Sequence, residues 1–473
     1  MAPLTKTKLN TMMSQRSTDE NLLRREARRP SLAVLMEVVL LIGCGAEAST
    51  DDASVRRDSG ARADSGSRMD SGARADSGSH MDSGARADSG AAPDATTPGW
   101  DAGPSDFTPH PRMSAIMPGE AHDLLAYSCN DRVDQYLCAS IHDYSGFSYD
   151  PYGHRILFFG GGHSATARTD IDTLELDPSS PHSLEWRSLY PSMTCAQTSY
   201  GDGSAPDIDP GGFHRSTGHP TSRHTYDLNV VAMTEAGPRF VMLSYEGFAG
   251  ECHRYDHVAN AIPSYPLYGA SPEWSYHTVE SRGWYYAAQA EFDPVSGMII
   301  AIDQAGLSVY DPNPSTEGIV AQVEGVRING YDGNLVFYPP TGDMYYISRT
   351  LREGDPVEVH RVVLNREDWS RSTATRVEVS GTPPVFRGGF ATGYAYDPEH
   401  QRIGGGILDG VFYRFDPRTN AWSAQSITSV SDGGRTVDRV VFHTLVYDPV
   451  NRVFLFEVGR PRQERLWAYR DTP

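Results

Sequence analysis

The chain has 473 residues and a formal net charge of −20 at pH 7, from 61 acidic side chains against 41 Lys and Arg. A surface of this sign repels the phosphate backbone, so the composition argues against nucleic acid as a partner. No dinucleotide-binding glycine motif, phosphate-binding loop or kinase motif stands in a credible sequence context, and we therefore expect no nucleotide cofactor.

Residues 1–44 have the pattern of a sorting signal. Four arginines within residues 24–29 precede an apolar stretch, residues 32–43, and Cys44 follows it directly. The stretch is too short to span a bilayer as a permanent helix. The pattern resembles a bacterial lipoprotein signal, which implies export to the cell envelope and a lipid anchor on Cys44 as the only membrane attachment. Glu37 departs from the pattern, and an ordinary cleaved signal with a chance cysteine is the alternative.

Residues 45–105 form a low-complexity segment. The triplet Asp-Ser-Gly recurs there with a strict six-residue period, starting at Asp58, Asp64, Asp70, Asp76, Asp82 and Asp88. The repeats contain no Leu, Ile, Val or aromatic residue, so they cannot bury enough apolar surface to offset the entropy lost on ordering. We predict a disordered tether that holds the next domain away from a membrane surface. A calcium-binding repeat is the alternative, but its interleaved apolar residues are missing.

Residues 106–473 are dominated by one cassette: an apolar segment, Tyr-Asp-Pro or a close variant, a short turn and a second apolar run. Clear copies contain Asp150, Asp293, Asp397 and Asp448, a degenerate copy covers residues 336–347, and a looser copy covers residues 224–243. We expect strand, turn and strand in each copy, because the Asp side chain can cap the turn and Pro presets its φ. Repetition of such a hairpin at tens of residues predicts an all-β fold, a β-propeller.

Several cassettes continue into two further predicted strands, with a tryptophan near the outer strand, as at Trp186 and Trp422. Four strands per unit and six countable cassettes predict six blades, or seven if residues 274–286 belong to another. Because each blade packs only on its neighbours, about 370 residues can form a single domain. We expect ring closure to pair a strand near residues 458–469 with a strand from the N-terminal part of the domain.

One stretch supports a more specific comparison. Residues 415–422 read Phe-Asp-Pro-Arg-Thr-Asn-Ala-Trp, and Gly160-Gly161 ends an apolar run in the first cassette. With the Tyr-Asp-Pro turns, these features resemble kelch repeats and the central propeller of galactose-oxidase-like proteins. The resemblance covers residues 140–473 and implies a fold rather than an activity.

Five cysteines are present, and four remain for the exported domain once Cys44 is assigned to the anchor. An even number in an exported chain favours disulfides. Cys129 and Cys138 are close enough in sequence to pair, which leaves Cys195 and Cys252.

Polar residues gather in the segments beside the first two cassettes. His142 precedes the first cassette, His163 follows a triple glycine, and Tyr200 and Arg223 precede the second cassette. Loops at the mouth of a propeller commonly carry its function, so these four residues are candidates for one site. Close backbone packing explains the glycines but does not explain His163. A hydrogen-bonded structural role is the alternative for a single histidine there.

Two histidines, an arginine and a tyrosine suit β-elimination on a uronate polysaccharide. Arg can neutralise the substrate carboxylate, which acidifies the C5 proton, and His can accept that proton near neutral pH. The set resembles that of the propeller-fold ulvan lyases. The resemblance implies that His142 and His163 are the base and its neighbour. It also implies that Tyr200 protonates the leaving O4 oxygen and that Arg223 neutralises the carboxylate.

The same lyases carry a structural zinc ion bound by His and Cys, which implies a zinc site here formed by His224, Cys252 and His253. These residue types are suitable zinc ligands. Adjacent residues of a regular strand point to opposite sides, so Cys252 and His253 can face one ion only where the chain turns. A disulfide between Cys195 and Cys252 competes with this zinc site.

Two other functions fit parts of the sequence. A copper radical oxidase would require a Tyr–Cys crosslink, and no feature of the sequence identifies a cysteine that forms one. A non-catalytic propeller that binds glycan or protein is the stronger alternative. The aromatic residues Trp274, Trp284, Tyr285 and Tyr286 could stack on sugar rings, although such residues more often pack between blades. We predict a monomeric, surface-anchored lyase that cleaves an acidic polysaccharide, whose identity the sequence does not specify.

Overall fold

The computed structural model describes residues 107–473, except for residues 128–144, 161–168, 191–212, 216, 222–224, 244–245, 248–256, 259–260, 270–271, 279–287, 304, 327, 329–330, 350–353, 386–392, 439 and 460–464. The described residues belong to one compact unit, Ala91–Pro473. None of the helices within these described ranges is long and apolar enough to cross a membrane.

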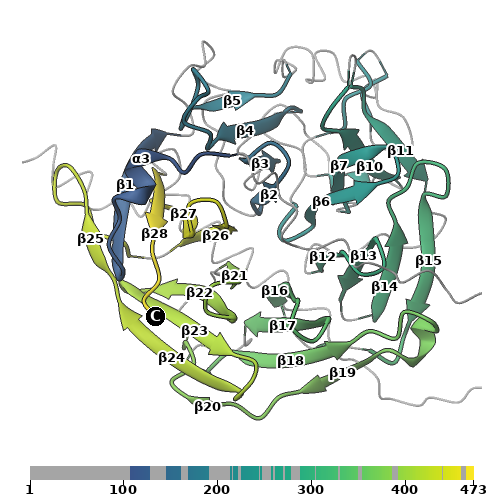
Figure 1. Ribbon diagram of the computed structural model, residues 1–473. Coiled ribbons are helices and arrows are strands. Elements are labelled where there is room, and N and C mark those ends of the chain that lie inside the picture. Colours follow the sequence, from purple (N-terminus) through teal and green to yellow (C-terminus); the bar gives the residue numbers. More distant parts are fainter. Residues whose placement is uncertain are drawn as a thin grey trace, which may run out of the picture. The chain divides into compact units, whose positions relative to one another are not determined.

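Six mainly antiparallel sheets stand around a common axis and form a six-bladed β-propeller (Figure 1). We number them blades 1 to 6 in chain order and give their strands from the axis outward. Blade 1 contains β2 (Ser148–Asp150), β3 (Arg155–Phe159), β4 (Ile171–Glu175) and β5 (Trp186–Ser188). Blade 2 contains β6 (Asn229–Thr234), β7 (Gly237–Met242), β10 (Ala261–Pro266) and β11 (Ser275–Thr278). Blade 3 contains β12 (Gln289–Asp293), β13 (Met298–Ile302), β14 (Leu307–Asp311) and β15 (Gly318–Val323).

The second half of the ring repeats this order. Blade 4 contains β16 (Tyr331–Tyr338), β17 (Asp343–Arg349), β18 (Glu358–Val363) and β19 (Thr373–Arg376). Blade 5 contains β21 (Tyr394–Asp397), β22 (Arg402–Leu408), β23 (Val411–Asp416), β24 (Ala421–Ser426) and β20 (Ser380–Gly381). Blade 6 contains β26 (Val440–Asp448), β27 (Val453–Val458), β28 (Arg465–Tyr469), β1 (Glu120–Tyr127) and β25 (Thr428–Val430). The other described elements are α3 (Pro111–Ser114), η1 (Trp369–Arg371) and the pair β8 (Glu246–Gly247) and β9 (His257–Val258). The predicted all-β propeller is confirmed.

The ring closes in the way that the sequence predicts. Strand β28 pairs antiparallel with β1, so that Tyr469 lies opposite Ala121. Blade 6 therefore combines β26, β27 and β28 from the C-terminal end with β1 from the start of the domain, and β25 pairs with β1 at the outer edge. The alternative of a seventh blade is wrong, because residues 275–278 form the outermost strand of blade 2, where Ile262 lies opposite His277.

The Asp residues of the clear cassettes cap their turns as predicted. In blade 1, Asp150 Oδ1 accepts hydrogen bonds from the main-chain amides of Tyr152 at 3.0 Å and Gly153 at 3.2 Å. The carboxylates of Asp293, Asp397 and Asp448 each accept a hydrogen bond from the amide two positions later, at 3.2, 2.9 and 3.0 Å, respectively. These bonds satisfy turn amides that have no partner in the sheet.

The looser cassette has a different register from the one we predicted. Strand β6 begins at Asn229, and the hairpin turns between Thr234 and Gly237, which has a φ of 104°. Asp227 therefore precedes the inner strand of blade 2 instead of capping its turn. No proline follows Asp227, and its polar groups bond to neighbouring blades rather than to a local turn.

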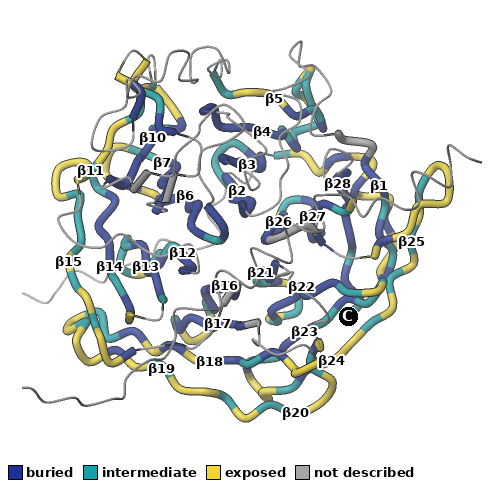
Figure 2. Tube along the Cα trace, turned by 180° about the vertical axis from the view of Figure 1, so that it is seen from behind, coloured by how far each residue is buried: buried dark blue, intermediate teal, exposed yellow. Residues whose placement is uncertain are grey.

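The apolar core lies between the blades. Burial of the strand residues falls from the inner strands to the outer ones, so the outermost strands are the most exposed (Figure 2). Ile299 packs in a cluster with Val241 of blade 2, whereas the next residue, Ile300, packs in a cluster with Phe337 of blade 4. Successive side chains of a strand point to opposite faces, and both faces of a blade are covered. This explains why the second strand of each cassette is a continuous apolar run instead of an alternating pattern.

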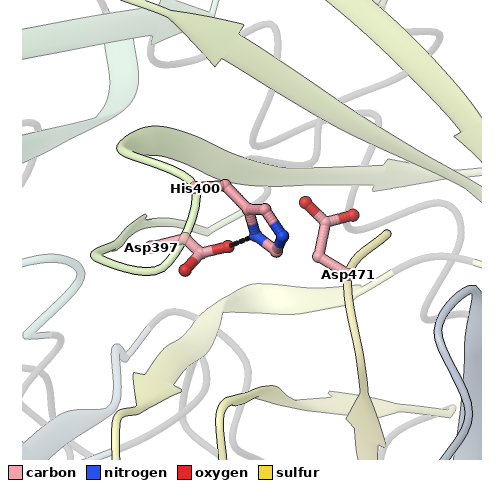
Figure 3. Close-up of side chains that lie close together, drawn as sticks. All are labelled: Asp397, His400 and Asp471. Carbon is pink, nitrogen blue, oxygen red and sulfur yellow. Dashed lines mark hydrogen bonds and ion pairs between the residues drawn. The ribbon is translucent and has the colours of Figure 1, made fainter. Parts of the chain in front are cut away.

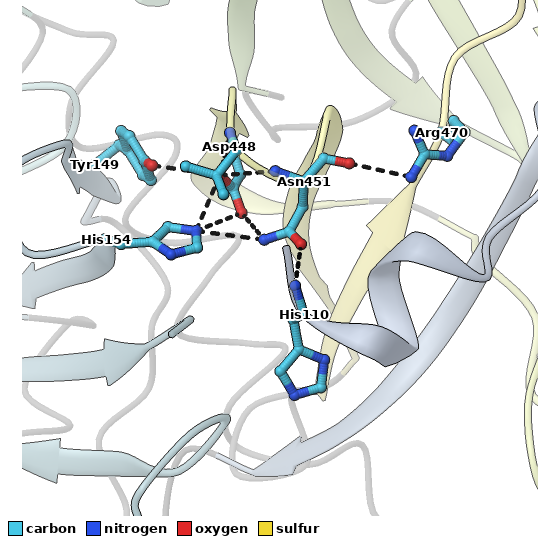
Figure 4. A network of polar contacts seen from close by, with 7 residues as sticks. His110, Tyr149, His154, Asp448, Asn451 and Arg470 are labelled. Atoms are coloured by element: carbon cyan, nitrogen blue, oxygen red, sulfur yellow. Dashed lines mark hydrogen bonds and ion pairs between the residues drawn. The ribbon is translucent and has the colours of Figure 1, made fainter. Parts of the chain in front are cut away.

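A buried polar network joins blade 1 to blade 6 (Figure 4). Asp448 accepts a hydrogen bond from the Tyr149 hydroxyl at 3.3 Å, and its Oδ2 lies 3.1 Å from His154 Nε2. Asn451 donates to the same carboxylate at 2.5 Å and accepts a hydrogen bond from the His110 amide at 2.6 Å. The Asp of one Tyr-Asp-Pro turn thus accepts a hydrogen bond from the Tyr of the next blade. This contact recurs between blades 5 and 6, where Tyr447 hydrogen-bonds to the carboxylate of Asp397.

Candidate functional site

The site residues predicted from the sequence lie outside the described part of the chain. They are the catalytic candidates His142, His163, Tyr200 and Arg223, the zinc candidates His224, Cys252 and His253, and the anchor Cys44. Their mutual arrangement stays a prediction, and the described residues that flank these segments define the candidate site.

Residues beside three of the predicted catalytic positions are hydrogen-bonded to one another. The Thr225 amide donates to Ser145 Oγ at 3.3 Å, and the Thr225 hydroxyl donates to the carbonyl oxygen of Phe159 at 3.1 Å. The Asn229 side-chain amide donates to the Gly146 carbonyl oxygen at 3.3 Å and to the Thr225 hydroxyl at 2.8 Å. All five residues are buried. We call this group the junction of blades 1 and 2.

Two residues beside this junction have a backbone conformation that is rare for side chains other than Gly. His443 has a φ of 50° and Tyr226 a φ of 43°, and their ring centroids are 6.2 Å apart. The His443 carbonyl oxygen accepts a hydrogen bond from the Phe147 amide at 3.2 Å. Left-handed backbone at non-glycine residues costs free energy and is concentrated at functional sites. Burial lowers the pKa of His443 to about 3, so its imidazole is neutral near pH 7.

Glycine at position 146 is required by this packing. A Cβ atom added there would lie 2.6 Å from the Tyr226 carbonyl oxygen and 3.2 Å from His443 Cβ. Three blades therefore meet at the junction with no room for a side chain.

The aromatic residue Trp274 packs within the described part of the chain. Its indole N–H donates to the Tyr190 hydroxyl at 2.6 Å, and its ring lies near Phe159 at 5.7 Å and Tyr265 at 5.2 Å between ring centroids. These contacts join blades 1 and 2. They favour the packing role over sugar stacking for this residue, whereas Trp284, Tyr285 and Tyr286 lie outside the described residues.

A second polar group lies on the innermost strands of blades 2, 3 and 4. Asp227 directly precedes β6, and its side-chain Oδ2 accepts a hydrogen bond from the Leu335 amide of β16 at 3.2 Å. Its carbonyl oxygen accepts one from the Ala290 amide of β12 at 2.9 Å, and its carboxylate also hydrogen-bonds to the Asn334 side chain. Asp227 thus joins the start of blade 2 to blades 3 and 4. We call Asp227, Glu291 and Asn334 the axial acid cluster.

Both carboxyl groups of the axial acid cluster have raised pKa values. Burial is the main cause of the raised pKa of Asp227, the charge of Glu291 adds to it, and the bonds from Leu335 and Asn334 oppose it. Burial raises the pKa of Glu291 to about 8, against the opposing bond from the Phe292 amide. Both residues are half-buried.

The sequence carries a signal for Glu291, although this residue is not among the predicted site residues. Glu291 lies two positions before the turn Asp, where the other clear cassettes have Ser148, Ala395 and Val446. When the cassettes are aligned, Glu291 is the one acidic residue at a position where the other clear copies have a small or apolar side chain. Asp227 is followed by Leu228 and not by proline, which indicates that this Asp does not belong to an Asp-Pro turn.

A third group lies between blades 5 and 6 and consists of Asp397, His400 and Asp471 (Figure 3). One potential ligand atom from each residue lies within 4.8 Å of the others. His400 Nδ1 is 2.6 Å from Asp397 Oδ2, and Asp471 Oδ1 accepts a hydrogen bond from Arg414 Nε at 2.6 Å. Because each carboxylate already faces a basic side chain, we interpret this group as a buried ion-pair cluster rather than a metal site.

Comparison with known proteins assigns no family. No family model matches the chain. No curated protein matches it either. One similar solved structure is an auxiliary nutrient-binding protein from Bacteroides ovatus, with 12% identity, a TM-score of 0.41 and coverage of 70% of each chain. Another is hydrazine synthase from Kuenenia stuttgartiensis, with 10% identity, a TM-score of 0.37 and coverage of 68% of this chain and 82% of that one. The chain is a six-bladed β-propeller.

Proposed function

We propose that this protein is a lipid-anchored polysaccharide lyase that cleaves a uronate-containing glycan by β-elimination at the mouth beside blades 1 and 2. The proposal keeps the roles suggested by the similarity to propeller-fold ulvan lyases. One observation carries it: residues next to three of the four catalytic candidates in the sequence are bonded together at the junction.

Only a few residues separate three of the catalytic candidates from the junction in the sequence. His142 is three positions before Ser145, His163 is four positions after Phe159, and Arg223 is two positions before Thr225. Because consecutive Cα atoms are at most about 3.8 Å apart, these short connections tie the three candidates in the sequence to the junction. This connectivity supports the proposal that they serve one substrate site. Tyr200 is ten or more positions from the nearest described residue, so its role depends on the resemblance alone.

The reaction balances with these four groups. A histidine, His142 or His163, removes the C5 proton of the uronate, and the electron pair of that C–H bond forms the C4–C5 double bond. The C4–O4 bond breaks, and the leaving O4 oxygen takes a proton from Tyr200. Arg223 stabilises the charge that the carboxylate gains when C5 loses its proton. The reaction itself consumes no water and needs no redox partner.

The test is the absorbance of the unsaturated uronate end. The full chain is incubated with a panel of uronate polysaccharides, and ultraviolet absorbance is followed. We expect absorbance to grow with at least one of them and to fall by at least a hundredfold with Arg223→Ala, His142→Ala or His163→Ala. Arg187→Ala, which removes an exposed arginine from β5, is the control and should keep full activity.

A glycan-binding propeller without catalysis is the second candidate, and the same panel separates the two. Affinity for a uronate glycan with no absorbance in any incubation would replace the lyase by a binding protein. Neither affinity nor absorbance across the panel would exclude both functions for such glycans.

A further inference from the structure

The axial acid cluster differs from the turn carboxylates of two clear cassettes, because neither of its acids pairs with a basic side chain of the described residues. The turn residues Asp150 and Asp293 form ion pairs with Arg155 at 2.8 Å and Arg366 at 2.7 Å. In contrast, no ion pair of the described residues involves Asp227 or Glu291, and the bonds they accept come from main-chain amides and one side-chain amide. Two acidic groups from neighbouring blades thus lie close together, and no basic side chain of the described residues pairs with either.

An independent observation at the same place points to a ligand. Asn334 is 4% exposed, and its side-chain Oδ1 has no hydrogen-bond partner, although the same side chain hydrogen-bonds to Asp227. A buried carbonyl oxygen without a partner costs about 1–3 kcal/mol. Asn334 lies just after a register shift in the pairing of β16 with β17. Such irregularities redirect side chains, and they are common next to functional sites.

The orientation of Glu291 also fits a shared site. Glu291 pairs with Ile300 across β12 and β13, and directly paired residues share one face of the sheet. Ile300 packs against residues of blade 4, including Leu335, so this face of blade 3 is the one turned toward β16. The side chains of Glu291, Asp227 and Asn334 therefore approach one region near the axis from three blades.

We infer that the axial acid cluster binds one divalent cation of the calcium type, which joins the inner strands of blades 2, 3 and 4. The donor atoms are two carboxylates and one amide oxygen, the hard oxygen ligands that calcium prefers. The group contains no His or Cys, which argues against zinc or copper. A cation of charge +2 displaces the protons that these two carboxyl groups retain when buried, balances the resulting carboxylates and gives Asn334 Oδ1 its missing partner. This site is independent of the proposed lyase reaction.

Calcium binding to the full chain tests the inference directly. After treatment with a chelator, calcium is titrated back and followed by calorimetry, by native mass spectrometry and by thermal unfolding. We expect one tightly bound calcium ion per chain at this site, and a melting temperature that rises by about 3 °C when calcium is at a hundred times its dissociation constant. Asp227→Asn and Glu291→Gln keep the side-chain outline, and each should weaken this binding at least tenfold.

Asp343→Asn is the matched control, since it removes a buried carboxylate of blade 4 that is paired with Arg361 away from the axis. This variant should unfold at a lower temperature but keep the full shift with calcium. The absence of any calcium-dependent heat or thermal shift in the parent protein would overturn the inference. Retention of the full shift in both Asp227→Asn and Glu291→Gln would also overturn it, because calcium would then bind elsewhere, for example on the Asp-Ser-Gly repeats.

Discussion

Tyr149 of blade 1 donates a hydrogen bond to Asp448 of blade 6, across a separation of 299 positions in the sequence. The bond connects the first and last Tyr-Asp-Pro turns of the ring. Burial, followed by the charge of Asp448, raises the pKa of the Tyr149 hydroxyl well above its usual range, so it remains a donor at all ordinary pH values. The cassette therefore has two roles: its Asp shapes a local turn, and its Tyr binds the Asp of the preceding blade.

The first prediction concerns this contact. Tyr149→Phe should lower the free energy of unfolding by about 1.5–3 kcal/mol, because it removes a buried hydrogen bond to a charged acceptor. Asp448→Ala should cost more, about 3–5 kcal/mol, because His154 then loses its buried partner. Urea unfolding of each variant measures both values.

Tyr396→Phe is the control for Tyr149→Phe. Tyr396 occupies the same cassette position in blade 5, but blade 4 has Pro339 in place of the turn Asp. The Tyr396 ring packs edge-on against Tyr338, and its hydroxyl makes no hydrogen bond to a described residue. Removal of this hydroxyl should change stability by less than about 0.5 kcal/mol. If Tyr149→Phe and Tyr396→Phe lowered the free energy of unfolding equally, the hydrogen bond from Tyr149 would not stabilise the contact between blades.

The second prediction concerns acid sensitivity. The folded-state pKa of His443, about 3, lies below its unfolded value near 6.5, so only the unfolded chain takes up the proton between these values. The contribution of neutral His443 to the free energy of unfolding is fully present above pH 6.5. It is lost at up to about 1.4 kcal/mol per pH unit as the pH falls from 6.5 to 3.

His443→Asn tests this, since Asn tolerates the left-handed backbone of this position better than most residues. Urea unfolding at pH 7 and pH 4 measures how much the free energy of unfolding falls in acid. We expect a smaller fall in this variant than in the parent protein. The hypothesis fails if the His443→Asn variant loses as much stability in acid as the parent.

The third prediction concerns close packing between blades 5 and 6. A Cβ atom at Gly404 would lie 2.6 Å from Cζ of both Phe412 and Phe454. Gly404→Ala should therefore destabilise the fold by about 1–3 kcal/mol through overpacking. At Gly325 an added Cβ meets no atom within 4 Å, and Gly325→Ala should be close to neutral. Thermal unfolding of the pair measures the difference, and equal melting temperatures would contradict the packing explanation.

The fourth prediction concerns the cysteines. We expect one zinc ion per chain, bound by His224, Cys252 and His253, and lost in Cys252→Ser. Metal analysis of the purified protein measures the stoichiometry, and peptide mass mapping without reduction detects the competing disulfide. A Cys195–Cys252 crosslink in metal-free protein would show that the zinc prediction is wrong. Cys129→Ser, outside the proposed ligand set, should leave the zinc content unchanged.

Some features of this protein follow from local sequence alone. The Asp-Pro turns and the strand pairs that flank them are confirmed. The pairing of residues near 469 with the start of the domain is also confirmed, but it follows from the closure of the predicted ring and not from a local signal. These signals are readable because Asp and Pro act on a turn of four residues, and because apolar runs mark buried strands wherever they occur.

Only the folded ring decided which distant groups meet. The sequence does not reveal that Asp448 would receive Tyr149, or that Asp227 would accept a bond from Leu335, 108 positions later. Such pairs depend on the number of blades, their angular order and the register of each inner strand. Those quantities are set by packing between whole sheets, and no residue's local preference encodes them, so the axial acid cluster becomes visible only when the blades stand side by side.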